Sequence, residues 1–597
     1  MPHNQDTTLV VSHPQTNGVN GIHLDPQAIP NSHKSAITDD GRRAFPTLEV
    51  PVLIIGGGPV GVFCGILLAK YGIRSTIVER HATRLGQPKA HAINPRSLEI
   101  FRQVGLDTDL LRSLGLSPAD GDLVRFAASM TGTEYGNLPY ERQWPETKEI
   151  TPEPLFNMPQ PVLEDYLYDV AMQCGMVTVW RGIEWLGSLC TDDEYEESCL
   201  WNQRTKRVTQ IRSRYLLACD GANARSRERL GIPFSVVDGH SRAPAHHISI
   251  HFNANLRKLK SGTLWFIMSP KENGTFICYD RSSSWVYVMD YDPAVTPAET
   301  FTEQSCRSAI ENAIGRKFEF DILDITFWST SPRIADFYSS DAHPTAFLVG
   351  DAAHAFPPTG GLGINTGFAD AHNLVTKTFA VESKWTDTPQ KFLSCYGHER
   401  RPLAIANAVQ SFINQQKLGK LREVIVEASG TDPQARVQNP EYREQIEDAI
   451  RDNVDHFDSI YLQIGYEYND NLKGRLKSCR DFAPRCAPGA RLPHGWIRRH
   501  GMTCSTLDLI DGDTFVLLVT CEFGTQDTAV HYLTARAVPV RIWRAGVDFL
   551  DLDGRWSGLM GLTNGESGIL IRPDQHIVGR FKNLEETEIA LRDYLHR

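Results

Sequence analysis

The chain has 597 residues, 41% of them hydrophobic and 22% charged, with a formal net charge of −11 at pH 7. This length exceeds what one hydrophobic core supports, so two to four domains are expected. The acidic balance, without a dense stripe of Lys and Arg, argues against a nucleic-acid-binding surface. Twelve cysteines are scattered without a C-x-x-C pair. That pattern fits a reducing compartment such as the cytoplasm and predicts no metal site.

The start of the chain carries no globular pattern. Residues 1–47 are rich in Asn, Gln, His, Pro, Ser and Thr, which predicts a disordered tail, although a targeting role stays open. No secretory signal pattern is present. The uncharged run 51–69 is long enough to mimic a membrane span, but its glycines and proline fit a phosphate-binding turn better. No transmembrane segment is therefore expected.

Residues 52–79 predict a strand, a glycine-rich turn, a helix and a second strand. The turn reads Gly-Gly-Gly-Pro-Val-Gly at 56–61, which is a G-x-G-x-x-G pattern in the context that dinucleotide binding requires. Gly56 permits the tight turn, Gly58 lets the backbone approach a pyrophosphate, and Gly61 lets helix and strand pack closely. A glycine-rich turn of some other α/β protein is the alternative.

The second strand of this unit ends in an acid, Glu79. It stands about 20 residues beyond the turn, where the fingerprint places the residue that binds a ribose hydroxyl. In the loop that follows, Lys89 and His91 precede a helix that begins near Pro95. This loop is either an exposed basic surface or a site in which Lys89 contacts phosphate and His91 faces a substrate.

The middle of the chain changes to short β-rich runs separated by Ser, Gly, Asn and Pro, which predicts an antiparallel sheet over 245–330. On its last run, Trp285, Tyr287 and Met289 share one face by the period-two rule. Such a face is usually core, but it would also suit a flat ligand. The expected strands are 248–252, 263–268, 275–279 and 285–291.

A strand at 346–350 then delivers Asp351, and a glycine-rich loop over 352–362 leads into a helix. The carboxylate could accept a hydrogen bond from a polyol hydroxyl, and the N-terminus of the helix could stabilise a developing negative charge. Residues 390–475 are mostly helical and charged. After a Pro- and Arg-rich linker at 481–493, strands at 515–519, 531–533, 538–543 and 568–571 predict a small separate α/β domain.

Taken together, these motifs resemble those of the class A flavoprotein aromatic hydroxylases, the p-hydroxybenzoate hydroxylase group. Three of the family's motifs occur in order, and Pro488–His494 with Ser505–Leu509 is similar to the start of the thioredoxin-like tail of the phenol hydroxylase and 2,4-dichlorophenol 6-monooxygenase branch. The resemblance covers roughly residues 49–595. The three motifs are Gly56–Gly61 with Glu79; Cys219–Asn223; and Gly350–His354 with Pro357-Pro358 and Gly360–Gly363.

The resemblance implies an FAD cofactor and assigns residues to it. Glu79 would bind the adenosine ribose, Asp351 the ribityl chain and Gln160 another part of FAD, while 361–365 would face the flavin ring. The full predicted set is Gly56, Gly58, Pro59, Gly61, Glu79, Arg80, Lys89, Gln160, Asp351, Pro358, Gly361, Gly363, Ile364 and Asn365.

Two positions depart from the family pattern. Lys89 stands where an arginine usually contacts the pyrophosphate, and a lysine should hold it less rigidly. Ala224 replaces the serine of the Asp-Gly-x-x-Ser-x-x-Arg motif, although Arg227 is retained, which puts the usual nicotinamide docking at this turn in doubt. No second G-x-G-x-x-G with its strand and helix is present, so NAD(P)H would dock transiently on the FAD domain.

The implied activity is hydroxylation of a phenolic or other electron-rich aromatic with NADPH or NADH and O2, through a C4a-hydroperoxyflavin; a secondary metabolite is one possible substrate. Catalytic candidates are His91 and Tyr287 as bases that deprotonate the phenol, together with Arg281. A homodimer is expected. The alternatives are an epoxidase, oxidase, halogenase or Baeyer–Villiger-type enzyme on the same scaffold, or a non-catalytic flavin-binding protein; the halogenase motif Trp-x-Trp-x-Ile-Pro is absent.

The expected fold is α/β: a Rossmann-like FAD-binding domain, an interleaved antiparallel-sheet substrate domain and a C-terminal thioredoxin-like domain. That last domain lacks C-x-x-C, so no thiol chemistry is assigned to it. The predicted boundaries are 1–47 for the tail, 48–235 and 345–480 for the two parts of the FAD domain with its helical region, 236–344 for the substrate domain, and 481–597 for the C-terminal domain.

Overall fold

The structure is a computed structural model. It describes residues 48–84, 86, 89–191, 194–237, 244–427, 439–468, 478–520, 523, 538–562 and 567–596, with two short strands before them. Those strands, β1 (Ala36–Ile37) and β2 (Arg43–Ala44), pair antiparallel. The rest of the predicted tail, and the strand expected at 531–533, lie outside the described residues.

The first sheet has the order β10-β11-β12-β3-β4-β9, and β20 also pairs with β12. Strands β3, β4, β9, β12 and β20 pair in parallel, and β10 and β11 extend the sheet as antiparallel strands. Residues 52–55 of β3 are buried, as a parallel strand covered on both faces requires. The strands of the first sheet are β3 (Leu48–Ile55), β4 (Ser75–Glu79), β9 (Val177–Arg181), β10 (Ile183–Thr191), β11 (Tyr195–Asn202), β12 (Arg207–Ala218) and β20 (Ala346–Leu348). The helices of this part of the chain are α1 (Pro59–Lys70), α5 (Gln160–Gln173) and α8 (Gly363–Glu382).

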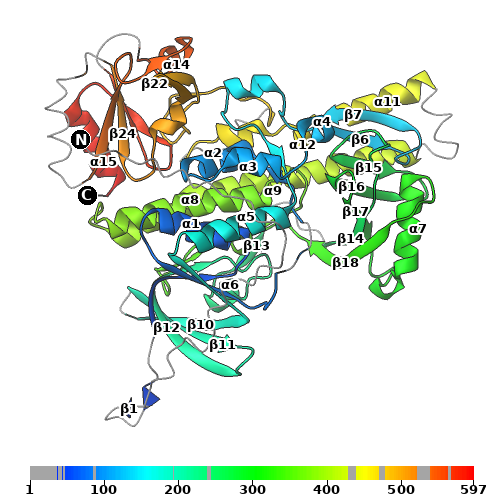
Figure 1. Ribbon diagram of the computed structural model, residues 1–597, viewed down its shortest axis with the longest axis horizontal. Helices are drawn as coiled ribbons and strands as arrows, with labels where there is room; N and C mark the ends of the chain where they lie inside the picture. Colours follow the sequence, from blue (N-terminus) through cyan, green and yellow to red (C-terminus); the bar gives the residue numbers. More distant parts are fainter. Residues whose placement is uncertain are drawn as a thin grey trace.

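The second sheet has the order β18-β14-β17-β16-β15-β6-β7 and lies to the right of the first in Figure 1. The four expected strands are present. The sequence assigned 123–139 to the FAD domain, but β6 and β7 join this second sheet, because β6 pairs in parallel with β15. The strands are β6 (Leu123–Ala127), β7 (Glu134–Pro139), β14 (Ala245–Asn253), β15 (Leu264–Met268), β16 (Asn273–Asp280), β17 (Ser284–Tyr291) and β18 (Asp321–Thr330).

One face of the second sheet is closed by helix α7 (Glu303–Ile314). The helix buries Cys306, Ile310 and Ile314, spaced three to four residues apart, in the same core as Trp285 and Tyr287. The aromatic face of β17 is therefore core and not a ligand wall. The opposite face, which carries Val286 and Val288, lines a large cavity.

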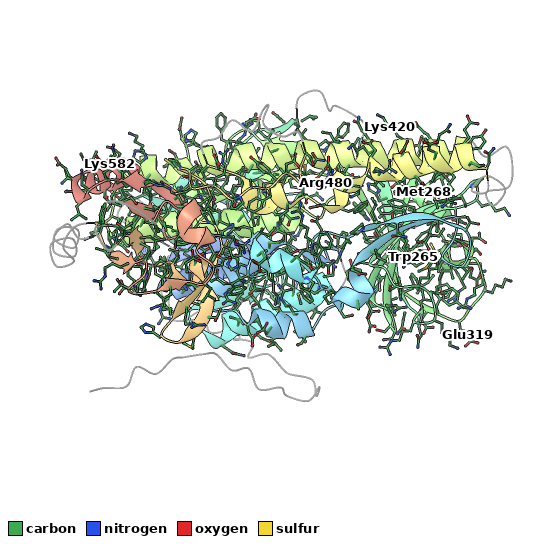
Figure 2. All side chains as sticks on the ribbon, turned by 90° about the horizontal axis from the view of Figure 1, so that it is seen from above. Trp265, Met268, Glu319, Lys420, Arg480 and Lys582 are labelled. Carbon is green, nitrogen blue, oxygen red and sulfur yellow. The ribbon has the colours of Figure 1, made fainter. Side chains whose placement is uncertain are left out.

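Helix α9 (Pro389–Glu427) runs along the molecule from α8 to the second sheet. Figure 2 labels Lys420 of α9 and Met268 of β15 at this end of the helix, and both residues line the large cavity. Smaller elements connect the layers: β5 (Ala92–Ile93), α2 (Pro95–Gln103), α3 (Thr108–Ser113), α4 (Pro118–Gly121), β8 (Phe156–Asn157), α6 (Arg225–Arg229), β13 (Phe234–Val236), β19 (Arg333–Ala335), β21 (His354–Ala355), α11 (Pro440–Arg451) and α12 (Val454–Phe457).

The C-terminal segment forms its own core around two small sheets. One has the order β25-β24-β27-β28 with one parallel and two antiparallel pairs, and the other is β23-β22-β26. The expected mix of strands and helices is present, but Phe515, Leu517 and Leu570 pack in the core of the first sheet. That this segment is a separate domain, and a thioredoxin-like one, stays a prediction. The elements are β22 (Trp496–Arg499), β23 (Met502–Ser505), β24 (Phe515–Val519), β25 (Val540–Arg544), β26 (Leu550–Asp551), α14 (Arg555–Leu559), β27 (Gly568–Ile571), β28 (Ile577–Phe581) and α15 (Leu584–Tyr594).

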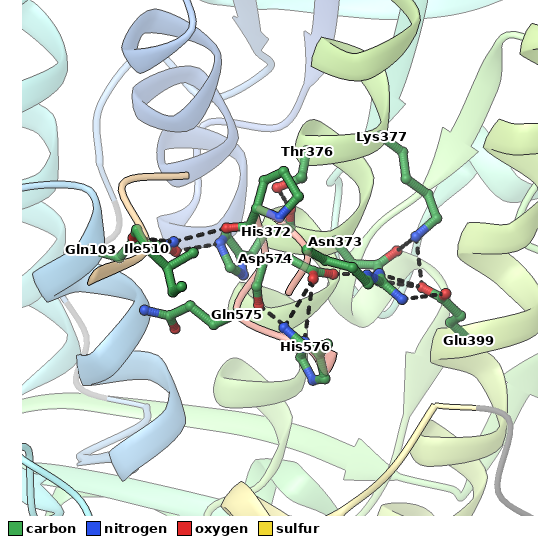
Figure 3. A network of polar contacts seen from close by, with 12 residues as sticks. Gln103, His372, Asn373, Thr376, Lys377, Glu399, Ile510, Asp574, Gln575 and His576 are labelled. Carbon is green, nitrogen blue, oxygen red and sulfur yellow. Dashed lines mark hydrogen bonds and ion pairs between the residues drawn. The ribbon is translucent and has the colours of Figure 1, made fainter. Parts of the chain in front are cut away.

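A network of buried charged side chains connects the C-terminal segment to helices α8 and α9 (Figure 3). Glu399 of α9 accepts hydrogen bonds from both terminal nitrogens of Arg572, at 2.7 and 3.0 Å, and from Lys377 of α8, at 2.6 Å. Asp574 forms a second ion pair with Arg572. All four side chains are buried. Because α8 begins at the cavity, the network ties the C-terminal domain to a helix of the candidate site.

Candidate functional site

A cavity of about 2070 Å³ lies where the first sheet, the second sheet and α9 meet. Pockets for single small ligands usually measure about 300–1,000 Å³, so this one has room for a dinucleotide and a second molecule. Its walls come from the glycine turn at 56–60, the loop at 89–92, the turn at 219–223, the loop at 354–364 and the open face of the second sheet.

The glycine turn has the geometry that its sequence predicts. Gly56 has a φ of +102°, and a Cβ there would lie 2.4 Å from the Cys219 carbonyl oxygen. A Cβ on Gly61 would lie 2.1 Å from the Gly56 carbonyl oxygen, so helix and turn touch through this glycine. A Cβ on Gly58 would meet nothing within 4 Å. Space at Gly58 thus remains for an incoming group, beside an α1 N-terminus that no side chain caps.

Four predicted cofactor residues beyond the turn line the same cavity: Glu79, Arg80, Lys89 and Gln160. The Glu79 carboxylate accepts the backbone N–H groups of Gly57 and His81, both at 2.8 Å, which fixes it beside the turn. The Gln160 side chain accepts the Ala90 N–H at 3.1 Å and donates to Glu164 at 2.6 Å.

Asp351 is exposed within the cavity, although protein surrounds the space around it. This desolvation raises the pKa of its carboxyl group, while the nearby charges of His354 and Lys89 act in the opposite direction. Lys89 and Asp351 therefore face the same space from two distant parts of the chain.

The glycine loop before α8 also lines the cavity, through Pro358, Gly361, Gly363 and Ile364 among others. The N-terminus of α8 has no side-chain cap. The side chain of Asn365 does not join this wall: it is buried, accepts the Asn94 N–H at 2.9 Å and donates to the Ala92 carbonyl at 2.9 Å. That prediction is corrected for the side chain, because the first helical turn rotates it toward α2.

These features fit FAD. Two uncapped helix N-termini, those of α1 and α8, face one cavity and suit a pyrophosphate and an electron-rich ring. Between them stand the acceptor Asp351 and the cation Lys89, and the open space at Gly58 allows close backbone approach. The arrangement therefore defines an FAD-binding protein of mixed α/β fold.

His91 lies in the wall of this cavity, one residue before β5. Its Nδ1 is 3.0 Å from the Asn157 side-chain oxygen. With the proton on Nδ1, Nε2 carries a lone pair that can accept a proton. Burial lowers the pKa of His91, against a smaller opposing effect of the Asn157 hydrogen bond. His91 is therefore a neutral imidazole at neutral pH.

The other two catalytic candidates lie elsewhere. Tyr287 is fully buried in the α7 core and stacks on Phe276 with ring centroids 4.4 Å apart. Arg281 pairs with Asp120 at 2.6 Å and donates to the Leu259 carbonyl at 2.5 Å, outside the cavity lining. Period-two patterning cannot tell which face of a strand meets the helix, and a lone arginine carries no signal for its partner. Neither residue is retained as a catalytic candidate.

One wall of the cavity is aromatic, and no sequence motif predicted it. Its cavity-lining rings are Tyr140, Phe266, His456 and Phe457, and they come from three distant parts of the chain. A Cβ on Gly361 would lie 3.9 Å from the Tyr140 hydroxyl, so this ring adjoins the glycine loop. The Tyr140 ring also lies 5.8 Å from His91 and 6.3 Å from Phe457, centroid to centroid.

The Asp-Gly turn keeps a serine despite Ala224. Ser226, two positions later, donates to the Asp220 carboxylate from both its N–H and its hydroxyl. Arg227 is buried and donates to the Ala352 carbonyl at 3.0 Å, which links this turn to the Asp351 segment. The turn is thus stabilised in spite of the departure, and whether NAD(P)H docks beside it stays a prediction.

Two family models match the chain: "FAD binding domain" over residues 49–411 and "Aromatic-ring hydroxylase, C-terminal" over residues 485–597. Among curated relatives, aklavinone 12-hydroxylase DnrF of Streptomyces peucetius subsp. caesius is 30% identical, with 83% of this chain and 95% of that protein covered. The 2,4-dichlorophenol 6-monooxygenase of Delftia acidovorans is 28% identical, with 90% and 96% covered.

Solved structures agree. A ternary complex of aklavinone-11 hydroxylase with FAD and aklavinone superposes with a TM-score of 0.76 at 26% identity, covering 92% of this chain and 100% of that one. The monooxygenase PieE, with FAD and substrate, gives 0.84 at 24% identity, covering 92% and 100%, and supports the fold alone.

The chain therefore belongs to the FAD-binding aromatic-ring hydroxylase family. It is an FAD-dependent aromatic monooxygenase, and NAD(P)H is the reductant that this family uses. The predicted family, fold class, cofactor and enzyme class are thereby confirmed. In the described part of the chain, no helix has the length and apolar character needed to cross a bilayer.

Proposed function

We propose that this enzyme hydroxylates a phenolic ring bound against the aromatic wall, next to the glycine loop at 360–363. The observation that carries the proposal is the position of Tyr140: its hydroxyl adjoins Gly361, and its ring adjoins His91. A flat substrate beside these residues would pack on aromatic side chains close to the cofactor loop, and offset or edge contacts favour such packing.

When bound and reduced by NAD(P)H, FAD would activate O2, which provides the oxygen atom that is transferred to the substrate. The residues of this chain would supply position and proton handling. Gly58, Lys89 and Asp351 would hold the cofactor, and the walls of the cavity would exclude water from the reacting atoms. His91, neutral and with Nδ1–H donated to Asn157, would accept the phenol proton at Nε2 and so raise the electron density of the ring.

The relatives act on substrates that range from 2,4-dichlorophenol to aklavinone, according to their names. By analogy with these names, a secondary metabolite of phenolic character is the substrate class that we propose here. The purified protein should be yellow, and NADPH or NADH should drive O2 uptake that phenols increase. Purification without flavin, or O2 uptake that no phenol changes, would refute the proposal.

We also propose a homodimer located in a reducing cytoplasm. The described cysteines are all free. Leu550, on the edge strand β26 of the small sheet β23-β22-β26, is an apolar side chain that is 51% exposed, and Val547 in the preceding turn is 57% exposed. Such exposed apolar side chains suit a contact with a second copy. Sedimentation at micromolar concentration tests the dimer, and Leu550→Glu should shift it to a monomer.

A further inference from the structure

His456 is a buried histidine of the cavity wall that the proposed mechanism does not use. Only 4% of its surface is exposed, yet it lines the cavity. Its Nδ1 is shielded on all sides, whereas its Nε2 keeps accessible surface and has no hydrogen-bond partner in the described part of the chain. A ligand in the cavity could therefore hydrogen-bond Nε2.

The surroundings of His456 are aromatic. Its ring stacks on Phe457, with centroids 4.0 Å and planes 17° apart, and meets the edge of Phe266 at 6.3 Å. Burial lowers the pKa of His456 to about 3, so the imidazole is neutral and offers one donor and one acceptor. This part of the wall is therefore aromatic and carries one imidazole that can hydrogen-bond a hydroxyl or carbonyl group of a flat ligand.

The segment that carries His456 is anchored to the segment that carries Tyr140. The Glu141 N–H donates to the Phe457 carbonyl at 2.5 Å, and the Glu141 carboxylate accepts the Ser459 N–H at 3.2 Å and the Gln463 amide at 2.9 Å. Arg142 pairs with Asp458 at 2.8 Å. His456 is thus held in fixed relation to Tyr140 and to the glycine loop.

His456 lies two ring contacts beyond Tyr140, through Phe457. Along the same cavity, the lining of α9 extends from Phe412 to Glu423, which is about 16 Å at 1.5 Å per residue. A single phenol beside Gly361 would leave the His456 end empty. A substrate of several fused rings would fill both ends.

We propose that His456 is a specificity-determining residue that hydrogen-bonds the far hydroxyl or carbonyl of a polycyclic phenol whose reactive ring lies at Tyr140 and His91. This inference rests on the proposed function and narrows its substrate class. The relevant ligand is a fused aromatic ring system with oxygen substituents at both ends.

The test measures the binding of two probes to the FAD-loaded enzyme by calorimetry: 2,6-dihydroxyanthraquinone and 2-hydroxyanthraquinone, which lacks the far hydroxyl. Wild type should bind the first about tenfold more tightly. His456→Phe should abolish this difference, and His456→Gln, which retains a polar group near the Nε2 position, should restore part of it. His398→Phe, at an exposed α9 position outside the cavity, should leave it unchanged.

Equal affinities of the two probes in wild type, or an unchanged difference in His456→Phe, would overturn the inference. If His456→Phe loses FAD, the comparison is made with His456→Gln, in which a reduced difference between the two probes supports the inference and an unchanged difference overturns it. Phenol turnover with no binding of either anthraquinone would refute the polycyclic assignment alone. Absence of substrate-linked O2 uptake with phenol and both probes would refute the proposed function itself.

Discussion

Two imidazoles in one cavity wall have different environments, and this difference assigns them different roles. His91 is oriented by Asn157 and adjoins Tyr140, whereas His456 is enclosed by Phe266 and Phe457. A base must be held in one tautomer and lie near the reacting group. Only His91 meets both conditions, so proton transfer is expected there and recognition at His456.

His91→Gln should retain FAD and its reduction by NAD(P)H but lower hydroxylation by roughly 10²–10⁴-fold if His91 is the base. Reduced flavin would then produce hydrogen peroxide instead of product. The measurement is the ratio of product formed to NAD(P)H consumed. His398→Gln, at an exposed α9 position outside the cavity, is the matched control and should leave this ratio unchanged. An unchanged ratio in His91→Gln would show that His91 is only a loop residue.

The pH dependence of that ratio follows from the direction of the His91 pKa. Burial lowers this pKa below its usual 6.5, and the neutral form is the one that accepts a proton. The ratio should therefore be constant from about pH 8 down to about pH 6.5 and should fall only at lower pH. A decline that begins above pH 7 would contradict the assigned environment.

Asp351→Ala should yield protein largely without flavin, because a ribityl hydroxyl would lose its acceptor at a cost of about 1–3 kcal/mol. Flavin content per protein, read from absorbance after gel filtration, measures this effect. Asp351→Asn retains an acceptor oxygen and should bind FAD more tightly than the alanine variant. Full flavin content in Asp351→Ala would remove this residue from the site.

At the scale of elements, Gly58 and Gly61 in the turn before α1 have different roles: Gly61 is required for packing, and Gly58 for cofactor binding. Gly61→Ala would place a Cβ 2.1 Å from the Gly56 carbonyl and should lower the melting temperature of the apoprotein. Gly58→Ala meets open space and should leave that temperature unchanged, yet weaken FAD binding through contact with the pyrophosphate. Equal melting temperatures in the two variants would contradict the role given to Gly61.

The same turn shows how much the sequence could predict. The strand, glycines and acid at 52–79 lie close together along the chain, so local patterning predicts them, and Asp351 follows from its strand in the same way. Tyr140 could not be predicted, because β6 and β7 join the second sheet through the pairing of β6 with β15, far along the chain. His456 could not be predicted either, because its segment joins the wall through contacts of Phe457 with Tyr140 and Phe266, which are distant in sequence. Tyr287 was misplaced because alternation does not specify which face α7 covers.

At the scale of the whole molecule, the C-terminal domain is bound to α8 and α9 by buried charges. Arg572→Met leaves the Glu399 and Asp574 carboxylates with fewer partners and should cost about 3–5 kcal/mol, as breaking buried pairs does. The midpoint of urea unfolding measures this loss. Arg555→Met, at an exposed pair, should leave the midpoint unchanged. Equal midpoints in the two variants would show that the network does not hold the domains together.

The stability that Glu399 contributes should persist well into acid. Its pKa is lowered to about 2, mainly by the charges of Arg572 and Lys377 acting against burial, from about 4.5 in the unfolded chain. A lowered carboxyl pKa stabilises the fold above the unfolded value, and this contribution is lost as pH falls from about 4.5 toward about 2. Urea midpoints of wild type and Glu399→Gln should therefore converge over that interval and differ above it.

The central claim is that this chain transfers one oxygen atom from O2 to a phenolic ring. The most direct measurement is turnover under ¹⁸O₂ with NADPH or NADH and a panel of one-ring and fused-ring phenols, with product analysed by mass spectrometry. The account predicts a hydroxylated product that carries one ¹⁸O atom for each NAD(P)H consumed. Hydrogen peroxide in equal amount to NAD(P)H with every phenol, or oxygen derived from water in the product, would contradict it.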